Sequence, residues 1–123
     1  MNWADYPNFS EAEFRCKHTG ACEMHPDFMK RLQHLRGVYG KPMTITSGYR
    51  APQHPIEAAK PTPGEHAYGR AADVAVQGAD ALRIVQLALG LGFTRIGVQQ
   101  KGSGRFIHLG DSPDFPSTIW SYP

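Results

Sequence analysis

Short apolar segments bounded by glycine or proline constrain the folding of this 123-residue chain more than any other feature. Met43–Ser47 lies between Pro42 and Gly48, and residues 94–99 and 105–109 flank the Gly102–Gly104 turn like the two strands of a hairpin. Glycine (13) and proline (10) make up about 19% of the chain, against a background of roughly 12%. The pattern predicts short strands and helices joined by turns and shaped loops.

Helical spacing predicts three helices. Ser10–Glu13 has the sequence of a capping box, so a short helix is expected to start there. Pro26 suits the first turn of a second helix, which Gly37 or Gly40 ends, and residues 79–89 predict a third. The predicted buried faces are Phe28, Met29, Leu32, Leu35 and Val38 in the second helix, and Leu82, Val85 and Leu89 in the third.

The order of the segments predicts the fold class. With strands at 43–47 and 73–76, the order is helix, helix, strand, strand, helix, strand, strand. This order favours an α+β fold, a single domain with a mainly antiparallel sheet and flanking helices. Residues 49–65 are expected to form an ordered loop that carries side chains. Residues 1–8 and 112–123 are expected to be peripheral, with the late aromatic residues packing back on the body.

Charge and hydropathy exclude several classes of partner. Thirteen Lys and Arg against 11 Asp and Glu leave a net charge of +2, and the basic residues are scattered, so no nucleic-acid partner is expected. No run of 18 apolar residues occurs, so no membrane insertion is expected. The first residues lack the basic and apolar regions of a signal peptide, so synthesis in the cytoplasm without one is expected.

Two cysteines and two histidines lie within ten residues of one another: Cys16, His18, Cys22 and His25. Thiolate and imidazole together are ligands that zinc accepts, although this spacing matches no zinc-finger pattern. Three interpretations stay open at this point. The cysteines are free thiols, they form a disulfide, or the group holds a second metal.

Polar residues also stand where a sheet protein would place packing side chains. His108 interrupts the apolar segment Arg105–Leu109, and Asp73 opens an apolar strand after two alanines. His66 precedes Asp73 by seven positions, and Gly69 between them allows a sharp turn. Each residue alone is explained by a hydrogen-bonded structural role. Together, two imidazoles and one carboxylate are the ligand set of a catalytic zinc with an open fourth position.

Three segments carry a resemblance to a known family. Ser47–Arg50, His66–Asp73 and Phe106–His108 resemble the zinc D-Ala-D-Ala carboxypeptidase family of peptidoglycan peptidases, which includes phage endolysins and has a hedgehog-like fold. The stretch His54–Lys60 is similar to the small phage-type members, and the likeness runs from about Phe9 to Tyr122.

The resemblance implies one zinc peptidase domain over residues 1–123, with one zinc ion per chain held by His66, Asp73 and His108. It implies peptides of bacterial peptidoglycan as the substrate and action at the cell wall as an endolysin. A separate protein is then expected to give access to the wall, and the chain is expected to be a monomer.

The resemblance also places Arg50 in the cleft, where a guanidinium offsets charge on a carbonyl oxygen or binds a substrate carboxylate. The general base is left open. Relatives often have an acid three residues before the last histidine ligand, but this chain has Arg105 there. Asp111 and Glu65 are equal candidates, ahead of His54 and Glu57 in the loop.

Two other functions stay open. The first is a module of the same fold that binds zinc and a peptide without cleaving it, or that serves as a structural part of a phage particle. The absence of an acid at position 105 favours it. The second is a cytoplasmic D,D-dipeptidase.

Overall fold

The sheet has five strands in the spatial order β1 (Thr44–Ser47), β2 (Ala71–Ala75), β4 (Phe106–Gly110), β3 (Arg95–Gln99) and β5 (Thr118–Ser121). The computed structural model describes residues 1–123. Neighbouring strands are antiparallel except for β3 and β5, which are parallel. The α+β fold with a mainly antiparallel sheet is therefore confirmed.

The helices are α1 (Glu11–Phe14), α2 (Pro26–Tyr39), α3 (Pro55–Ala58) and α4 (Gly78–Gly90), with short 3₁₀ turns η1 (Trp3–Asp5) and η2 (Glu65–Tyr68). The predicted capping box precedes α1, where the Glu13 carboxylate accepts a hydrogen bond from the Ser10 backbone N–H at 2.7 Å. Helix α2 starts at Pro26, as predicted, and of the two glycines proposed for its end it is Gly40, in the left-handed conformation, that terminates it. None of these helices has the length and apolar character needed to cross a bilayer.

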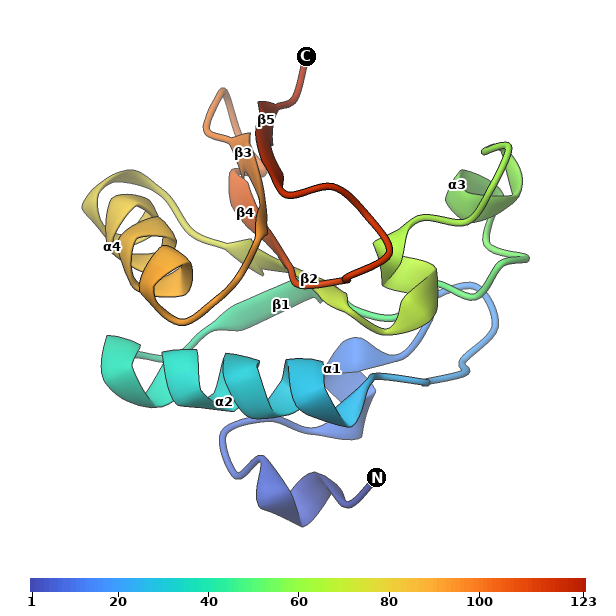
Figure 1. Ribbon diagram of the computed structural model, residues 1–123, viewed down its shortest axis with the longest axis horizontal. Helices are drawn as coiled ribbons and strands as arrows, with labels where there is room; N and C mark the ends of the chain where they lie inside the picture. The colour runs from blue at the N-terminus through green and yellow to red at the C-terminus, as the bar shows by residue number, and fades with distance from the viewer.

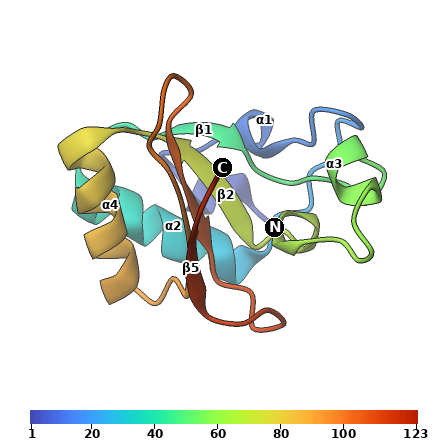
Figure 2. The same cartoon turned by 90° about the horizontal axis from the view of Figure 1, so that it is seen from above.

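The sheet has one core face and one polar face. Side chains alternate between the two faces of a strand, so Val74, Ile96, Ile107 and Leu109 enter the hydrophobic core. Helix α2 lies beneath the sheet in Figure 1, and α4 lies on the left. Figure 2 shows α3 and its loop at the opposite end of the molecule from α4. The opposite face of the sheet is thereby left for polar side chains.

One row of residues crosses four of the five strands on the polar face. Asp73 pairs with His108, His108 with Gly97, and Gly97 with Trp120. A Cβ atom on Gly97 would lie 2.8 Å from the Trp120 ring and 2.9 Å from His108 Cβ, so glycine is needed there. The ring centroids of Trp120 and His108 are consequently only 4.9 Å apart.

Several predictions about the elements were wrong. Helix α4 buries Ala81, Ile84 and Ala88, whereas Leu82 and Leu89 are 72% and 59% exposed. The side of the helix that packs on the core carries two alanines and one isoleucine, and the two leucines face solvent. In α2, Val38 is also exposed. The expected loop contains α3, and the tail contains strand β5.

Candidate metal centre

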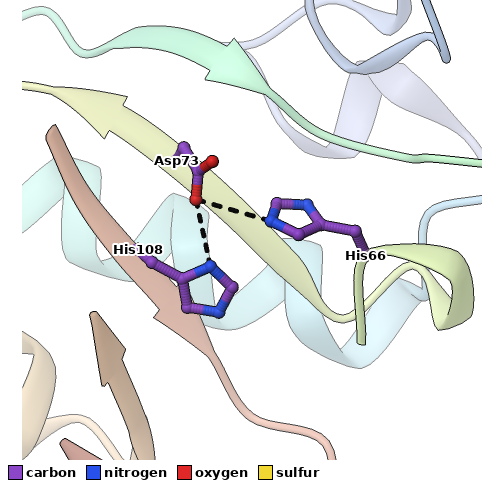
Figure 3. A group of neighbouring side chains, drawn as sticks. All are labelled: His66, Asp73 and His108. Atoms are coloured by element: carbon purple, nitrogen blue, oxygen red, sulfur yellow. Dashed lines mark hydrogen bonds and ion pairs between the residues drawn. The ribbon is translucent and has the colours of Figure 1, made fainter. Parts of the chain in front are cut away.

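Three side chains converge on the polar face of the sheet: His66, Asp73 and His108. Asp73 on β2 and His108 on β4 are direct cross-strand partners, whereas His66 comes from η2. Figure 3 shows the two imidazoles turned toward the same carboxylate. One donor atom from each residue lies within 4.8 Å of the other two, and all three residues are buried. These are the three residues that the sequence predicts as zinc ligands.

A tight turn at Gly69 brings His66 back over β2. Gly69 ends η2 with φ +68, in the left-handed region. Its missing side chain also matters, because a Cβ atom there would collide with the backbone of Glu23, Met24 and His25. The turn places His66 Nε2 3.4 Å from Asp73 Oδ1. On the other side, His108 Nδ1 is 3.0 Å from the same oxygen.

The outer hydrogen bonds of the two imidazoles define which nitrogens face inward. His66 Nδ1–H donates to the Gly48 carbonyl oxygen at 2.7 Å, and His108 Nε2–H donates to Glu65 Oε1 at 2.5 Å. Neutral imidazoles with these protons present bare lone pairs from His66 Nε2 and His108 Nδ1 toward the Asp73 carboxylate. Either a proton or a metal ion between them satisfies these three acceptors. The donor set therefore fits a zinc ion.

The pKa values of the three residues follow from their burial and from the contacts between them. Burial lowers the pKa of His66, and the nearby Asp73 offsets this only in part. Burial also opposes charge on His108, but hydrogen bonds to Asp73 and Glu65 outweigh it and raise the pKa of His108. The pKa of Asp73 lies far below its usual range, because bonds to both imidazoles outweigh the opposite effect of burial. The site thus stabilises positive charge on His108 but not on His66.

Arg50, which the resemblance places in the cleft, lies beside this group. It follows the end of β1, and its backbone N–H donates to the His66 carbonyl oxygen at 3.2 Å. Its guanidinium is 3.3 Å from Glu57 Oε2 and 3.6 Å from Asp73 Oδ2. Glu57 also accepts from Lys60 Nζ at 3.0 Å and from the Gly64 N–H at 2.7 Å. The buried Glu57 carboxylate thereby orders the loop that carries Arg50.

The three converging residues line a cleft of about 440 Å³. Arg50 and Lys60 contribute cationic groups from the α3 loop. An aromatic wall, defined here as Phe106, Phe115, Trp120 and Tyr122, lines it from the C-terminal half of the chain. Only the packing of the late aromatic residues was predicted for this wall. The two-residue spacing of Trp120 and Tyr122 is the one signal in the sequence that could have placed them together on one strand face.

The two candidate bases occupy different places. Glu65 lines the cleft, and its carboxylate contacts His108. Asp111 lies outside the lining of the cleft. Its buried carboxylate pairs with Arg31 and with Arg70, whose Nε is 3.0 Å from Asp111 Oδ1. The structure therefore brings Glu65, but not Asp111, to the candidate site. Of the loop candidates, His54 accepts from the Ile56 N–H at the start of α3.

The cluster near the N-terminus does not form a second metal site of this kind. Cys16 and Cys22 are both free thiols, and neither belongs to a group of three converging metal-binding side chains. Burial disfavours the Cys16 thiolate, but hydrogen bonds from Thr19 and neighbouring backbone groups outweigh it and lower the pKa to about 7. His25 instead caps α2 by accepting from the Asp27 N–H at 3.1 Å.

Comparison with protein-family models gives a match. The model of a family described as Peptidase M15 matches residues 7–110, a range that includes all three converging residues and Arg50. No curated protein matches the chain.

Proposed function

Because the chain belongs to the peptidase M15 family, it is a zinc-dependent metallopeptidase, and we propose that it cleaves peptides of bacterial peptidoglycan. The proposed reaction is hydrolysis of an amide bond in a stem or cross-link peptide, as a D,D-carboxypeptidase or endopeptidase. One observation carries the proposal. Two imidazoles and one carboxylate converge in an open cleft beside the guanidinium of Arg50.

We assign the zinc ion to His66, Asp73 and His108. When bound, zinc polarises a scissile carbonyl group and lowers the pKa of a coordinated water. The outer hydrogen bonds to Gly48 and Glu65 hold the two imidazoles with their inner nitrogens toward Asp73. Prearranged ligands of this kind lose little freedom when a metal binds.

Arg50 supplies positive charge where the substrate reacts. Its side chain is 18% exposed, so one side faces the cleft while Glu57 and Asp73 hold the other. A guanidinium in this position stabilises negative charge on the carbonyl oxygen, or binds a substrate carboxylate with two parallel hydrogen bonds. Lys60 extends the cationic side of the cleft. The opposite aromatic wall provides apolar contact area for a peptide.

Further parts of the proposal concern the setting of the enzyme. We propose that it acts on the cell wall as a phage endolysin, in monomeric form, and that a separate protein gives it access to the wall. These parts rest on the resemblance of the motif segments to small phage-type peptidases. A cytoplasmic D,D-dipeptidase has the same chemistry but acts on a free dipeptide.

One observation favours a second candidate, a zinc-containing module that binds peptides without hydrolysis. The only carboxylates that line the cleft are Asp73 and Glu65, and both contact His108. A proton acceptor free of such contacts is absent from the cleft lining.

Cleavage of defined substrates distinguishes these functions. Purified peptidoglycan, a synthetic stem peptide and free D-Ala-D-Ala are each incubated with the zinc-loaded protein, and new amine ends are counted. Amine release from peptidoglycan or the stem peptide, abolished by a chelator and by His66→Ala but not by the surface variant His34→Ala, is the expected result. Zinc binding without cleavage would favour the binding module, and cleavage of the free dipeptide alone would favour the dipeptidase.

A further inference from the structure

The Glu65 carboxylate occupies an unusual position behind His108. The residue is 5% exposed, and its Oε1 is 2.5 Å from His108 Nε2. Its Oε2 is buried without a hydrogen-bond partner. A buried carboxylate is costly unless it has charged or hydrogen-bonding neighbours, so its neighbours explain why it is tolerated.

The sheet provides a space for this carboxylate. Gly110 on β4 is the cross-strand partner of Ala71 on β2 and of Arg95 on β3. A Cβ atom on Gly110 would overlap both carboxylate oxygens of Glu65. The carboxylate can therefore lie against the sheet only because residue 110 is glycine.

Arg95 supplies the opposite charge. Its Nε is 3.0 Å from Glu65 Oε1, and its side chain is only 14% exposed. The guanidinium carbon also lies 5.0 Å from the centroid of the Trp120 ring and 5.3 Å from that of Phe115. The Nη1 atom of Arg95 donates to the Pro116 carbonyl oxygen at 2.5 Å. Arg95 thus contacts both Glu65 and the aromatic wall.

We propose that Glu65 and Arg95 are positioning residues that fix the imidazole of His108 with Nδ1 toward the metal. Glu65 acts directly on Nε2, and Arg95 acts through Glu65. The two nitrogens of an imidazole point in diverging directions, so a carboxylate held at Nε2 lies behind the ring, away from the metal side. This arrangement gives Glu65 an orienting role in place of proton transfer. The inference rests on the proposed zinc site.

Zinc affinity measures this role without any need for activity. Zinc dissociation constants are determined at pH 8 by competition with a chromophoric chelator. Glu65→Ala is expected to weaken zinc binding by 10- to 100-fold, as removal of a partner of a metal-bound histidine typically does. Glu65→Gln keeps a hydrogen-bond acceptor and is expected to recover part of that loss. Arg95→Met is expected to cause a smaller loss, because it acts through Glu65.

Matched controls separate orientation from folding. Glu11→Gln and Arg83→Met make the same chemical changes as Glu65→Gln and Arg95→Met, but on exposed side chains. They should leave the zinc dissociation constant within twofold of the wild-type value. The thermal midpoint of each zinc-free variant reports folding. The visible absorption spectrum of the cobalt-loaded protein should shift in Glu65→Gln but not in Glu11→Gln, because it reports ligand geometry. Gly110→Ala should move the carboxylate and change the same spectrum.

The outcomes distinguish this inference from the proposed function. If wild-type protein binds one zinc ion and the folded Glu65 variants bind it with unchanged affinity and spectrum, the positioning role is wrong while the zinc site stands. If Glu65→Ala does not fold, equal zinc affinity in Arg95→Met, Glu65→Gln and wild type overturns the role. Failure of wild-type protein to bind zinc would overturn both the role and the zinc assignment.

Discussion

Arg50 is a cationic residue of the cleft whose position is defined by Glu57 and Asp73. We expect Arg50→Met to lower kcat/KM on the stem peptide by about 10²- to 10³-fold, the usual effect of losing one group that stabilises a developing oxyanion. Zinc content should stay at one per chain, because Arg50 is not a ligand. Arg83→Met, on the exposed side of α4, is the control. Equal kcat/KM values for the two variants would contradict the assignment.

The buried carboxylate of Glu57 makes the stability of the folded state depend on pH. Burial opposes its ionisation, but the Gly64 N–H, Lys60 and Arg50 outweigh burial and lower its pKa from the ordinary value of 4.5. The depressed pKa means that Glu57 stabilises the folded state above pH 4.5 and that this contribution is lost as the pH falls through the lower, folded-state value.

Urea unfolding at pH 6 and at pH 3 tests the contribution of Glu57. Glu57→Gln is expected to lower the unfolding free energy at pH 6 by about 1–3 kcal/mol, since it leaves buried donors poorly paired. The substitution should also reduce the difference between the unfolding free energies at pH 6 and at pH 3. Glu11→Gln, whose exposed carboxylate pairs with Arg15, should retain the wild-type difference. An identical pH difference in Glu57→Gln and wild type would exclude this role.

Single residues differ in how far the sequence reveals their roles. His108 could be singled out because it stands between the apolar residues Ile107 and Leu109. The contact of Glu65 with His108 could not be predicted from the sequence. It depends on the space above Gly110, and only the pairing of β2, β4 and β3 creates that space. The ion pairs of Asp111 likewise involve Arg31 on α2, 80 residues away in sequence.

At the scale of elements, the turn between η2 and β2 determines whether His66 and Asp73 meet. Gly69 and Gly102 have similar φ values of +68 and +62, but a Cβ atom meets backbone only at Gly69 and open space at Gly102. Each alanine substitution should cost about 1–2 kcal/mol for the left-handed conformation. Gly69→Ala should cost about 1–3 kcal/mol more, because the backbone must move.

Chemical denaturation of both glycine variants, together with their zinc affinities, checks this difference. Only Gly69→Ala should weaken zinc binding, because only this turn carries a ligand. Equal unfolding free energies for the two variants would show that the collision at Gly69 is relieved at no cost.

Local sequence signals predict some helices and strands of this fold but not others. Helix α2 and the hairpin of β3 and β4 follow from local signals: Pro26 at the helix start, Gly40 at its end, and a glycine turn between two apolar segments. Helix α4 was found, but its buried face was not, because periodicity alone does not show that the sheet accepts alanines rather than leucines. Strand β5 was missed because it pairs in parallel with β3, a partner that no local pattern indicates.

For the whole molecule, the proposed zinc site joins two distant parts of the chain, the consecutive elements η2 and β2 and the later strand β4. A ligand that binds only the folded state stabilises it by about 2.7 kcal/mol at a free concentration 100 times its dissociation constant. We therefore expect zinc to raise the thermal midpoint by several degrees and a chelator to reverse the rise. His66→Ala should show no rise and His34→Ala the full rise. An equal rise in His66→Ala would place the zinc elsewhere.

The contact between Trp120 and His108 has a photophysical consequence. The indole ring centroid lies 4.9 Å from that of the imidazole, whereas the only other tryptophan, Trp3, packs against Phe14 and Tyr6. A paramagnetic ion bound by His108 would lie close enough to quench the fluorescence of Trp120. The chain therefore carries its own fluorescent reporter of a paramagnetic ion such as cobalt at the proposed zinc site, with Trp3 as an internal reference, and Trp120→Phe should abolish the signal.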